Sequence, residues 1–188
     1  TIDGLELDTI TTGAVGSYRY RATFRGPGGH SLNAFGTVNP AYAMAAAVQG
    51  LSRIEVPAEP RTTHCASVFG GGTSINAIPN EVWVEIDLRS ESQAELDRLD
   101  ARLHALVEEA VAAENARGDT AAGRITTEMK RIGNRPAGRT DHGTRIVQAA
   151  LAALPAFGFA PTTKASSTDA NIPMSLGVPA ICLGSGGT

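Results

Sequence analysis

The chain has 188 residues, of which 42% are hydrophobic and 19% are charged, so it can form the core of one large domain or of one domain plus part of another. The formal net charge is −3 and lysine and arginine form no long cluster, which argues against a nucleic-acid-binding surface. No apolar run is long enough to span a bilayer. We therefore expect neither a nucleic acid nor a membrane as a partner.

The two cysteines, Cys65 and Cys182, are far apart and lie in apolar, strand-like stretches. We expect two buried, reduced thiols in a cytoplasmic protein, with a disulfide between them as the alternative. The sequence begins at Thr1 rather than at a methionine, and it ends just after an apolar segment. We therefore expect a fragment of a longer chain whose N-terminal part, including any targeting signal, is missing.

Four strands and two helices are expected in the first two thirds of the chain. Strand-like stretches lie at residues 15–25, 62–69, 82–89 and 124–132, and the first and third of these alternate apolar with polar side chains. The first helix begins with Asn39 as cap and Pro40 as first helical residue, and it runs to about residue 54. The second helix begins at Ser92, which forms a capping-box pattern with Glu95, and it runs to Gly118.

This order, strand–helix–strand–strand–helix–strand, predicts an α+β fold of the ferredoxin-like type. In that fold, four antiparallel strands form one layer and both helices cover one face of the sheet. We assign residues 14–135 to this domain and residues 1–13 to a lead-in or hinge. The uncovered face is expected to carry polar side chains such as Glu85 and Asp87 beside the arginines of the first strand.

Residues 136–188 predict an incomplete α/β segment that belongs to a second domain. A helix is expected over residues 140–154, a short strand over 162–164 and a further strand over 179–183, with a helical turn between the two strands. These elements are too few to cover their own apolar surface.

None of the four histidines stands at a spacing typical of a zinc site, and the sequence contains neither a phosphate-binding loop nor a nucleophile elbow. His104 lies within the second helix, His64 in a strand and His142 in the first turn of a helix, where structural or solvent-exposed roles are expected. His30 follows Gly-Pro-Gly-Gly on a tight loop, where backbone turns could aim its side chain outward. From this stretch alone, an ordinary exposed loop histidine is the favoured interpretation.

Three motifs together resemble the lid, or dimerisation, domain of the zinc metallopeptidase family M20. They are Gly-Pro-Gly-Gly-His-Ser at residues 26–31, Gly-Gly-Gly-Thr-Ser-Ile-Asn-Ala-Ile-Pro-Asn-Glu at 70–81 and Asp-Leu-Arg at 87–89. The stretch Ser-Thr-Asp-Ala-Asn-Ile-Pro at 167–173 and the glycine-rich end resemble the return of the chain into the catalytic domain. The family includes glutamate carboxypeptidases, acetylornithine and succinyl-diaminopimelate deacylases, aminoacylases and tripeptidase T.

The resemblance implies a homodimer formed through the lid domain. It also implies a parent enzyme that uses two zinc ions to hydrolyse an amide or peptide bond in a small peptide or N-acyl amino acid bearing a carboxylate. His30 would stabilise the oxyanion in the partner subunit's active site, and Asn76 would hydrogen-bond the substrate there. Arg89 and Arg135 would bind the substrate carboxylate. The metal ligands and general base of the family lie outside this sequence, so the chain alone is expected to hold no zinc and to be inactive.

A second interpretation belongs to a different class. A free-standing ferredoxin-like interaction or ligand-sensing module without catalysis would explain residues 15–135 equally well. It would not explain the incomplete α/β segment that follows.

Overall fold

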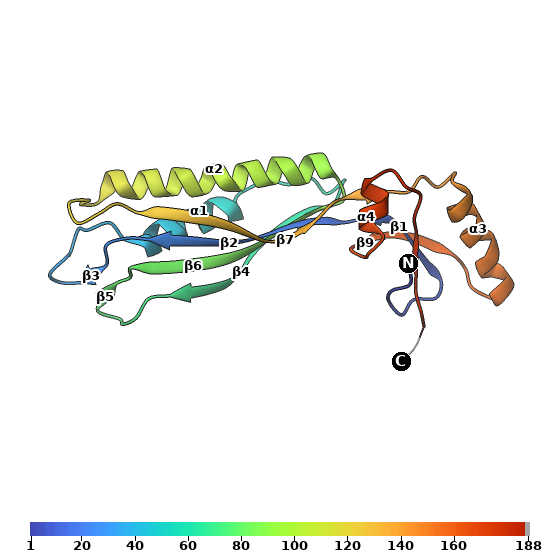
Figure 1. Cartoon of the computed structure of the whole chain (residues 1–188), viewed down its shortest axis with the longest axis horizontal. Coiled ribbons are helices and arrows are strands. Elements are labelled where there is room, and N and C mark those ends of the chain that lie inside the picture. The colour runs from blue at the N-terminus through green and yellow to red at the C-terminus, as the bar shows by residue number, and fades with distance from the viewer. Residues whose placement is uncertain (187–188) are drawn as a thin grey trace.

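The computed structural model describes residues 1–186 and has two four-stranded sheets at opposite ends of an elongated molecule (Figure 1). The strands are β1 (Thr9–Ala14), β2 (Gly16–Arg25), β3 (Gly29–His30), β4 (Thr62–Gly71), β5 (Ala77–Ile78), β6 (Glu81–Ser90), β7 (Thr126–Arg135), β8 (Gly138–Arg139), β9 (Thr162–Ser166) and β10 (Cys182–Leu183). The helices are α1 (Pro40–Ser52), α2 (Gln93–Arg117), α3 (Arg145–Ala153) and α4 (Asn171–Ser175), with a 3-10 turn η1 (Leu154–Phe157). Within the described residues, no helix combines the length and apolar character that a bilayer crossing requires.

The larger unit, here called the lid sandwich, has its strands in the order β4-β6-β2-β7, and every neighbouring pair is antiparallel. The helices α1 and α2 pack against each other and against one face of this sheet (Figure 1). This arrangement confirms the predicted ferredoxin-like α+β sandwich.

The core of the lid sandwich follows from the alternation of side chains in its two central strands. The even-numbered side chains of β2 from Tyr20 to Phe24 are buried, as are those of β6 from Val82 to Leu88. The long helix α2 covers them with fully buried leucines, among them Leu96, Leu99 and Leu103. Each such burial contributes about 1.5–3 kcal/mol, so the two layers are held together mainly by apolar contact.

Both predicted helix starts are present, although only one of the two hydrogen bonds of the predicted capping box forms at the second helix. The Asn39 side chain accepts a hydrogen bond of 2.9 Å from the backbone N–H of the second residue of α1. The Ser92 side chain accepts one of 3.4 Å from the backbone N–H of Glu95. The reciprocal half of the capping box is missing, because the Ser90 hydroxyl already accepts the N–H of Ser92. The Glu95 carboxylate pairs with Arg98 instead.

The second unit joins residues from both ends of the described chain. Strand β1 is parallel to β9 on one side and antiparallel to β8 and β10 on the other. The lead-in expected over residues 1–13 therefore contains a strand from Thr9 onward. The threonine-rich sequence of β1 lacks the alternation that marks a strand, and its pairing partners come more than 120 residues later.

The helix predicted over residues 140–154 begins later, at Arg145. Asp141 organises a turn before it, because its carboxylate accepts the backbone N–H of Gly143 at 2.6 Å. His142 consequently lies ahead of the helix rather than in its first turn. Its Nε2 is 3.0 Å from the Thr12 hydroxyl, so the side chain links this turn to β1.

The two cysteines are free thiols in the described structure, as predicted. The expectation that both are buried is wrong for Cys65, which is exposed, whereas Cys182 is buried. Cys65 is exposed because β4 is an edge strand and because its side chain lies on the sheet face that the helices leave uncovered.

Candidate functional site

His30 and Asn76 come together at the end of the lid sandwich that is remote from the second unit. The short strands β3 and β5 pair there, with His30 opposite Ala77. The backbone N–H of Ser31 donates to the carbonyl oxygen of Asn76 at 2.9 Å, which joins the two loops next to both side chains. The turn before His30 depends on Gly28, whose φ of +68° lies in the left-handed region that favours glycine.

Both side chains at this tip are exposed and arranged as hydrogen-bond donors. Nδ1 of His30 accepts the backbone N–H of Leu32 at 3.2 Å, so in the neutral ring the proton lies on the outward Nε2. The Asn76 side-chain oxygen accepts the Ser74 hydroxyl, which leaves the amide nitrogen free to donate. The pair can therefore present two N–H groups to an acceptor outside the lid sandwich.

Arg89 and Arg135 lie in one row across the sheet at its other end. Thr63 of β4 pairs with Arg89 of β6, Arg89 pairs with Ser17 of β2, and Ser17 pairs with Arg135 of β7. Paired residues point to the same face, so both arginines lie on the face that α1 and α2 leave open. One strand separates them, which sets their backbones about 10 Å apart.

This row borders the second unit. Nε of Arg89 donates to the Asp87 carboxylate at 2.6 Å, within the open face. Nη1 of Arg135 donates to the Ser167 hydroxyl at 3.4 Å, and its Nη2 lies 3.7 Å from the Asp169 carboxylate. A cavity of about 270 Å³ opens between the two units and is lined by Val15, Arg61, Thr63, Arg89, Glu91, Ala165, Ser166 and Ser167.

The structure thus brings the predicted site residues together as two pairs and keeps the pairs apart. Asn76 precedes β5 and β6, whereas Arg89 is the last residue but one of β6, a strand of ten residues. At about 3.3 Å per residue, that strand is roughly 30 Å long. Figure 1 shows β3 and β5 at one end of the lid sandwich and the second unit at the other. A small substrate cannot contact both pairs of one protomer.

The open face between the two pairs carries ion pairs between neighbouring strands, in agreement with the polar side chains predicted for it. Arg19 pairs with Asp87 at 2.8 Å and Arg21 with Glu85 at 2.7 Å. The Arg21 guanidinium also lies 4.1 Å from the centre of the Trp83 ring. These groups are partly exposed, and such pairs contribute only about 0–1 kcal/mol each.

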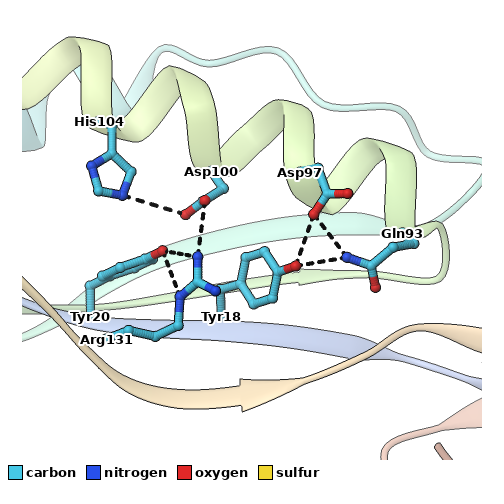
Figure 2. Close-up of polar contacts among 7 residues, drawn as sticks. All are labelled: Tyr18, Tyr20, Gln93, Asp97, Asp100, His104 and Arg131. Atoms are coloured by element: carbon cyan, nitrogen blue, oxygen red, sulfur yellow. Dashed lines mark hydrogen bonds and ion pairs between the residues drawn. The ribbon is translucent and has the colours of Figure 1, made fainter. Parts of the chain in front are cut away.

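A polar cluster that the sequence analysis did not single out lies on the opposite face, between α2 and the sheet (Figure 2). Its members are Tyr18, Tyr20, Gln93, Asp97, Asp100, His104 and Arg131. The Arg131 guanidinium lies 4.1 Å from the centre of the Tyr18 ring, donates to the Tyr20 hydroxyl and is 3.2 Å from the Asp100 carboxylate. Burial, and then the Asp100 carboxylate, raise the pKa of Tyr20 to about 12, so this hydroxyl stays protonated. The cluster fastens the helix layer to β7.

A zinc site requires several His, Cys, Asp or Glu side chains to converge on one point. Among residues 1–186, no group of three or more such side chains is placed to hold a metal ion. The described residues therefore do not fit the zinc ions that the resemblance implies.

The fold is a ferredoxin-like α+β sandwich joined to a second unit with its own four-stranded sheet. Residues 12–115 match the family model of the M20 peptidase dimerisation domain, and the chain belongs to this family. A comparison with curated proteins gives no significant match.

Solved structures with the same fold include two peptidases and an aminobenzoyl-glutamate utilization protein. Aminopeptidase PepT from Bacillus cereus has a TM-score of 0.78 at 21% identity, with 97% of this chain and 47% of that chain covered. A tripeptidase from Staphylococcus aureus has a TM-score of 0.76 at 20% identity, with 98% and 47% covered. The aminobenzoyl-glutamate utilization protein from Klebsiella pneumoniae has a TM-score of 0.74 at 20% identity, with 98% and 48% covered. The chain therefore spans about half the length of these proteins.

Proposed function

We propose that this chain is the lid and dimerisation part of a hydrolase that cleaves an amide or peptide bond in a small, carboxylate-bearing substrate. In this proposal residues 1–13 are the hinge, residues 14–135 the lid domain and residues 136–188 part of the return into the catalytic domain. The family and the peptidases that share the fold support a hydrolase as the parent protein. We also propose a reducing, cytoplasmic location for the parent protein.

The observation that carries the proposal is the separation of the two residue pairs along β6. His30 and Asn76 lie too far from Arg89 to serve the same small substrate within one protomer. A dimer resolves this, because the tip of one lid sandwich can reach a substrate held at the hinge end of the other. Each active site is then composed of residues from both subunits.

The role proposed for His30 follows from its donor geometry. Attack on an amide carbonyl creates an oxyanion, and a fixed N–H group aimed at that oxygen lowers the barrier. Nε2 of His30 faces outward with its proton because Nδ1 is occupied by the backbone. Asn76 offers a second N–H from the adjacent loop. We assign oxyanion stabilisation to His30 and substrate binding to Asn76, both acting in the partner subunit.

Arg89 and Arg135 are assigned to the substrate carboxylate. A guanidinium matches a carboxylate with two parallel N–H donors, and such charge-assisted bonds are stronger than neutral ones. Arg89 uses only Nε toward Asp87 and lines the cavity between the units, so its terminal nitrogens are available to donate. Two zinc ions belong to the proposed parent enzyme rather than to the described residues of this chain.

The surface proposed for dimerisation is α1 together with the edge strand β4. Between Cys65 and Phe69, β4 carries no charged side chain and exposes Val68 and Phe69. The opposite edge, β7, carries charged side chains such as Lys130, which discourage pairing between sheets. Only the β4 edge is therefore suited to meet a second copy, and a twofold axis is the commonest solution.

Mixed dimers of the full-length parent enzyme test the proposal. One subunit carries His30→Ala and intact metal ligands, and the other carries His30 and a disrupted metal site. Each homodimer should be nearly inactive, whereas the heterodimer should regain activity from its one complete composite site. If heterodimers form and stay inactive, His30 does not serve the partner's site. A parent chain without any hydrolase activity would favour the non-catalytic interaction module instead.

A further inference from the structure

A carboxylate of the chain itself lies beside one of the arginines assigned to the substrate carboxylate. Arg135 is the last residue of β7 in the lid sandwich, and Asp169 lies between β9 and α4 in the second unit. Nη2 of Arg135 is 3.7 Å from Oδ1 of Asp169. Among the described residues, this is the one ion pair that connects the two units.

The turn that carries Asp169 is held in place by its neighbours. The three residues around it, Thr168, Ala170 and Asn171, are buried, whereas the Asp169 side chain is 88% exposed. The backbone N–H of Thr168 donates to Oδ1 of Asn171 at 2.8 Å, and the backbone N–H of Ala170 donates to the Thr168 hydroxyl at 3.2 Å. The fold therefore fixes the backbone on both sides of Asp169 and presents its carboxylate next to Arg135.

The contact between Arg135 and Asp169 is weak. A separation of 3.7 Å is too long for a hydrogen bond, so the two groups attract each other through charge alone. The Arg135 side chain is 40% exposed, so solvent screens this attraction. Its Nη1 donates to the Ser167 hydroxyl at 3.4 Å, which is also a long contact. A carboxylate that approaches the guanidinium closely can form two parallel hydrogen bonds with it and can therefore displace Asp169.

We infer that Asp169 occupies the place of the substrate carboxylate at Arg135 when no substrate is bound, and that substrate displaces it. The inference rests on the proposed function, which assigns Arg135 to that carboxylate. Asp169 is then a positioning residue, because it holds the guanidinium toward the second unit before the substrate arrives. It also competes for Arg135, so the measured affinity reflects the exchange of one ion pair for another.

The 188-residue chain contains both residues and is the protein used in the test. The probes are N-acetylglycine, which carries one carboxylate, and N-acetylglycinamide, which carries none. Binding is followed by NMR through the side-chain Nε–H resonance of Arg135 and the backbone amides of residues 167–170. The variant Asp169→Asn should unfold at the same temperature as the wild-type chain, because the exposed side chain forms none of the hydrogen bonds that hold the turn.

Asp169→Asn should bind N-acetylglycine about two- to fivefold more tightly than the wild-type chain, the range expected when an exposed ion pair is lost. Asp169→Glu keeps the charge and should bind like the wild type. The affinity for N-acetylglycinamide should be the same in all three proteins. The matched control is Asp3→Asn, which removes an exposed carboxylate of the second unit and should change neither affinity.

A variant of the arginine separates competition at Arg135 from general charge repulsion. Arg135→Gln should weaken the binding of N-acetylglycine. In the Arg135→Gln background, Asp169→Asn should lose most of its effect, because the competing ion pair no longer exists. If Asp169→Asn strengthens binding equally with and without Arg135, the carboxylate only repels the probe and the inference is wrong.

Two further results would overturn the inference, and they differ in what they say about the proposed function. Equal affinity of the wild-type chain and Asp169→Asn for N-acetylglycine, with weaker binding by Arg135→Gln, would refute the competition and leave the carboxylate role of Arg135 intact. Binding that is unaffected by Arg135→Gln, or no binding of N-acetylglycine by any variant, would refute that role together with the inference. The mixed-dimer result for His30 would stand in either case.

Discussion

The buried side chain of Asn171 is hydrogen-bonded to the backbone of Val15, although 156 residues separate them. Its Nδ2 donates to the Val15 carbonyl oxygen and to the Pro136 carbonyl oxygen, each at 2.9 Å. Its Oδ1 accepts the backbone N–H of Thr168 at 2.8 Å. Val15 and Pro136 lie on the two chain segments that connect the lid sandwich to the second unit. One amide therefore holds both connections.

Asn171→Ala should destabilise the chain by about 2–3 kcal/mol, because three backbone groups, one buried and two partly buried, lose their partners at once. Urea unfolding measures the loss. Ser175→Ala is the control, since this exposed hydroxyl of α4 bonds only within its own turn. Equal losses for the two variants would mean that water or a rearranged backbone replaces the Asn171 contacts.

Arg131→Lys should cost about 1–2 kcal/mol of unfolding free energy despite the conserved charge. The fork contacts the Tyr20 hydroxyl and the Tyr18 ring at the same time, which an ammonium group cannot do. Arg98→Lys, in an exposed pair with Glu95, should cost less than about 0.5 kcal/mol. If Arg131→Lys lowered the unfolding free energy no more than Arg98→Lys, the cluster would not hold the helix layer to β7.

Glu114→Gln should make the unfolding free energy of the chain less dependent on pH in acid. The Arg117 guanidinium, and then the backbone N–H of Asn39, hold the pKa of the Glu114 carboxyl below its usual range, against the opposing effect of burial. A carboxyl with a lowered folded-state pKa stabilises the protein above its unfolded pKa of about 4.3, and this contribution is lost as the pH falls.

Unfolding free energies of the two proteins should therefore converge as the pH falls through the unfolded pKa of about 4.3 and below it. The exposed Glu109, paired with Arg102, provides the control variant Glu109→Gln, whose pH profile should match that of the wild type. Parallel pH profiles for wild type and Glu114→Gln would rule out this carboxyl as a source of acid sensitivity.

Phe69→Glu should shift the chain from dimer to monomer if β4 forms the proposed interface. Phe69 is 52% exposed on the β4 edge, and a charge there would be buried against a second copy. Ile132 is 48% exposed on β7, so Ile132→Glu is a matched change at the opposite edge and should leave the dimer intact. Sedimentation measures both. Dissociation by Ile132→Glu alone would place the interface on β7.

His30→Ala in the full-length parent enzyme should lower kcat by about 10²–10³-fold, the usual effect of removing one oxyanion donor. KM should change little, because the bond is made mainly in the transition state. Steady-state kinetics separate the two constants. A raised KM with an unchanged kcat would assign His30 to ground-state substrate binding.

Local sequence determined the lid sandwich almost completely. The alternation in residues 15–25 and 82–89 required β2 and β6 to bury one face, and Asn39 followed by Pro40 required a helix start. These patterns depend on residues only a few positions apart, so they can be predicted from the sequence alone. Strand β1 and the turn around His142 were not legible, because long-range pairing rather than local pattern stabilises them.

The sequence by itself predicted His30, Asn76 and Arg89 as candidate site residues through their motifs, and Arg135 through the family resemblance. Only the tertiary structure decided that they form two pairs at opposite ends of β6, and that Asn171 lies where the two units join. The physical reason is that strand register sets the positions of the four candidate residues, and that contacts between segments distant in sequence set the position of Asn171. Neither strand register nor these long-range contacts can be predicted from the order of residues along the chain.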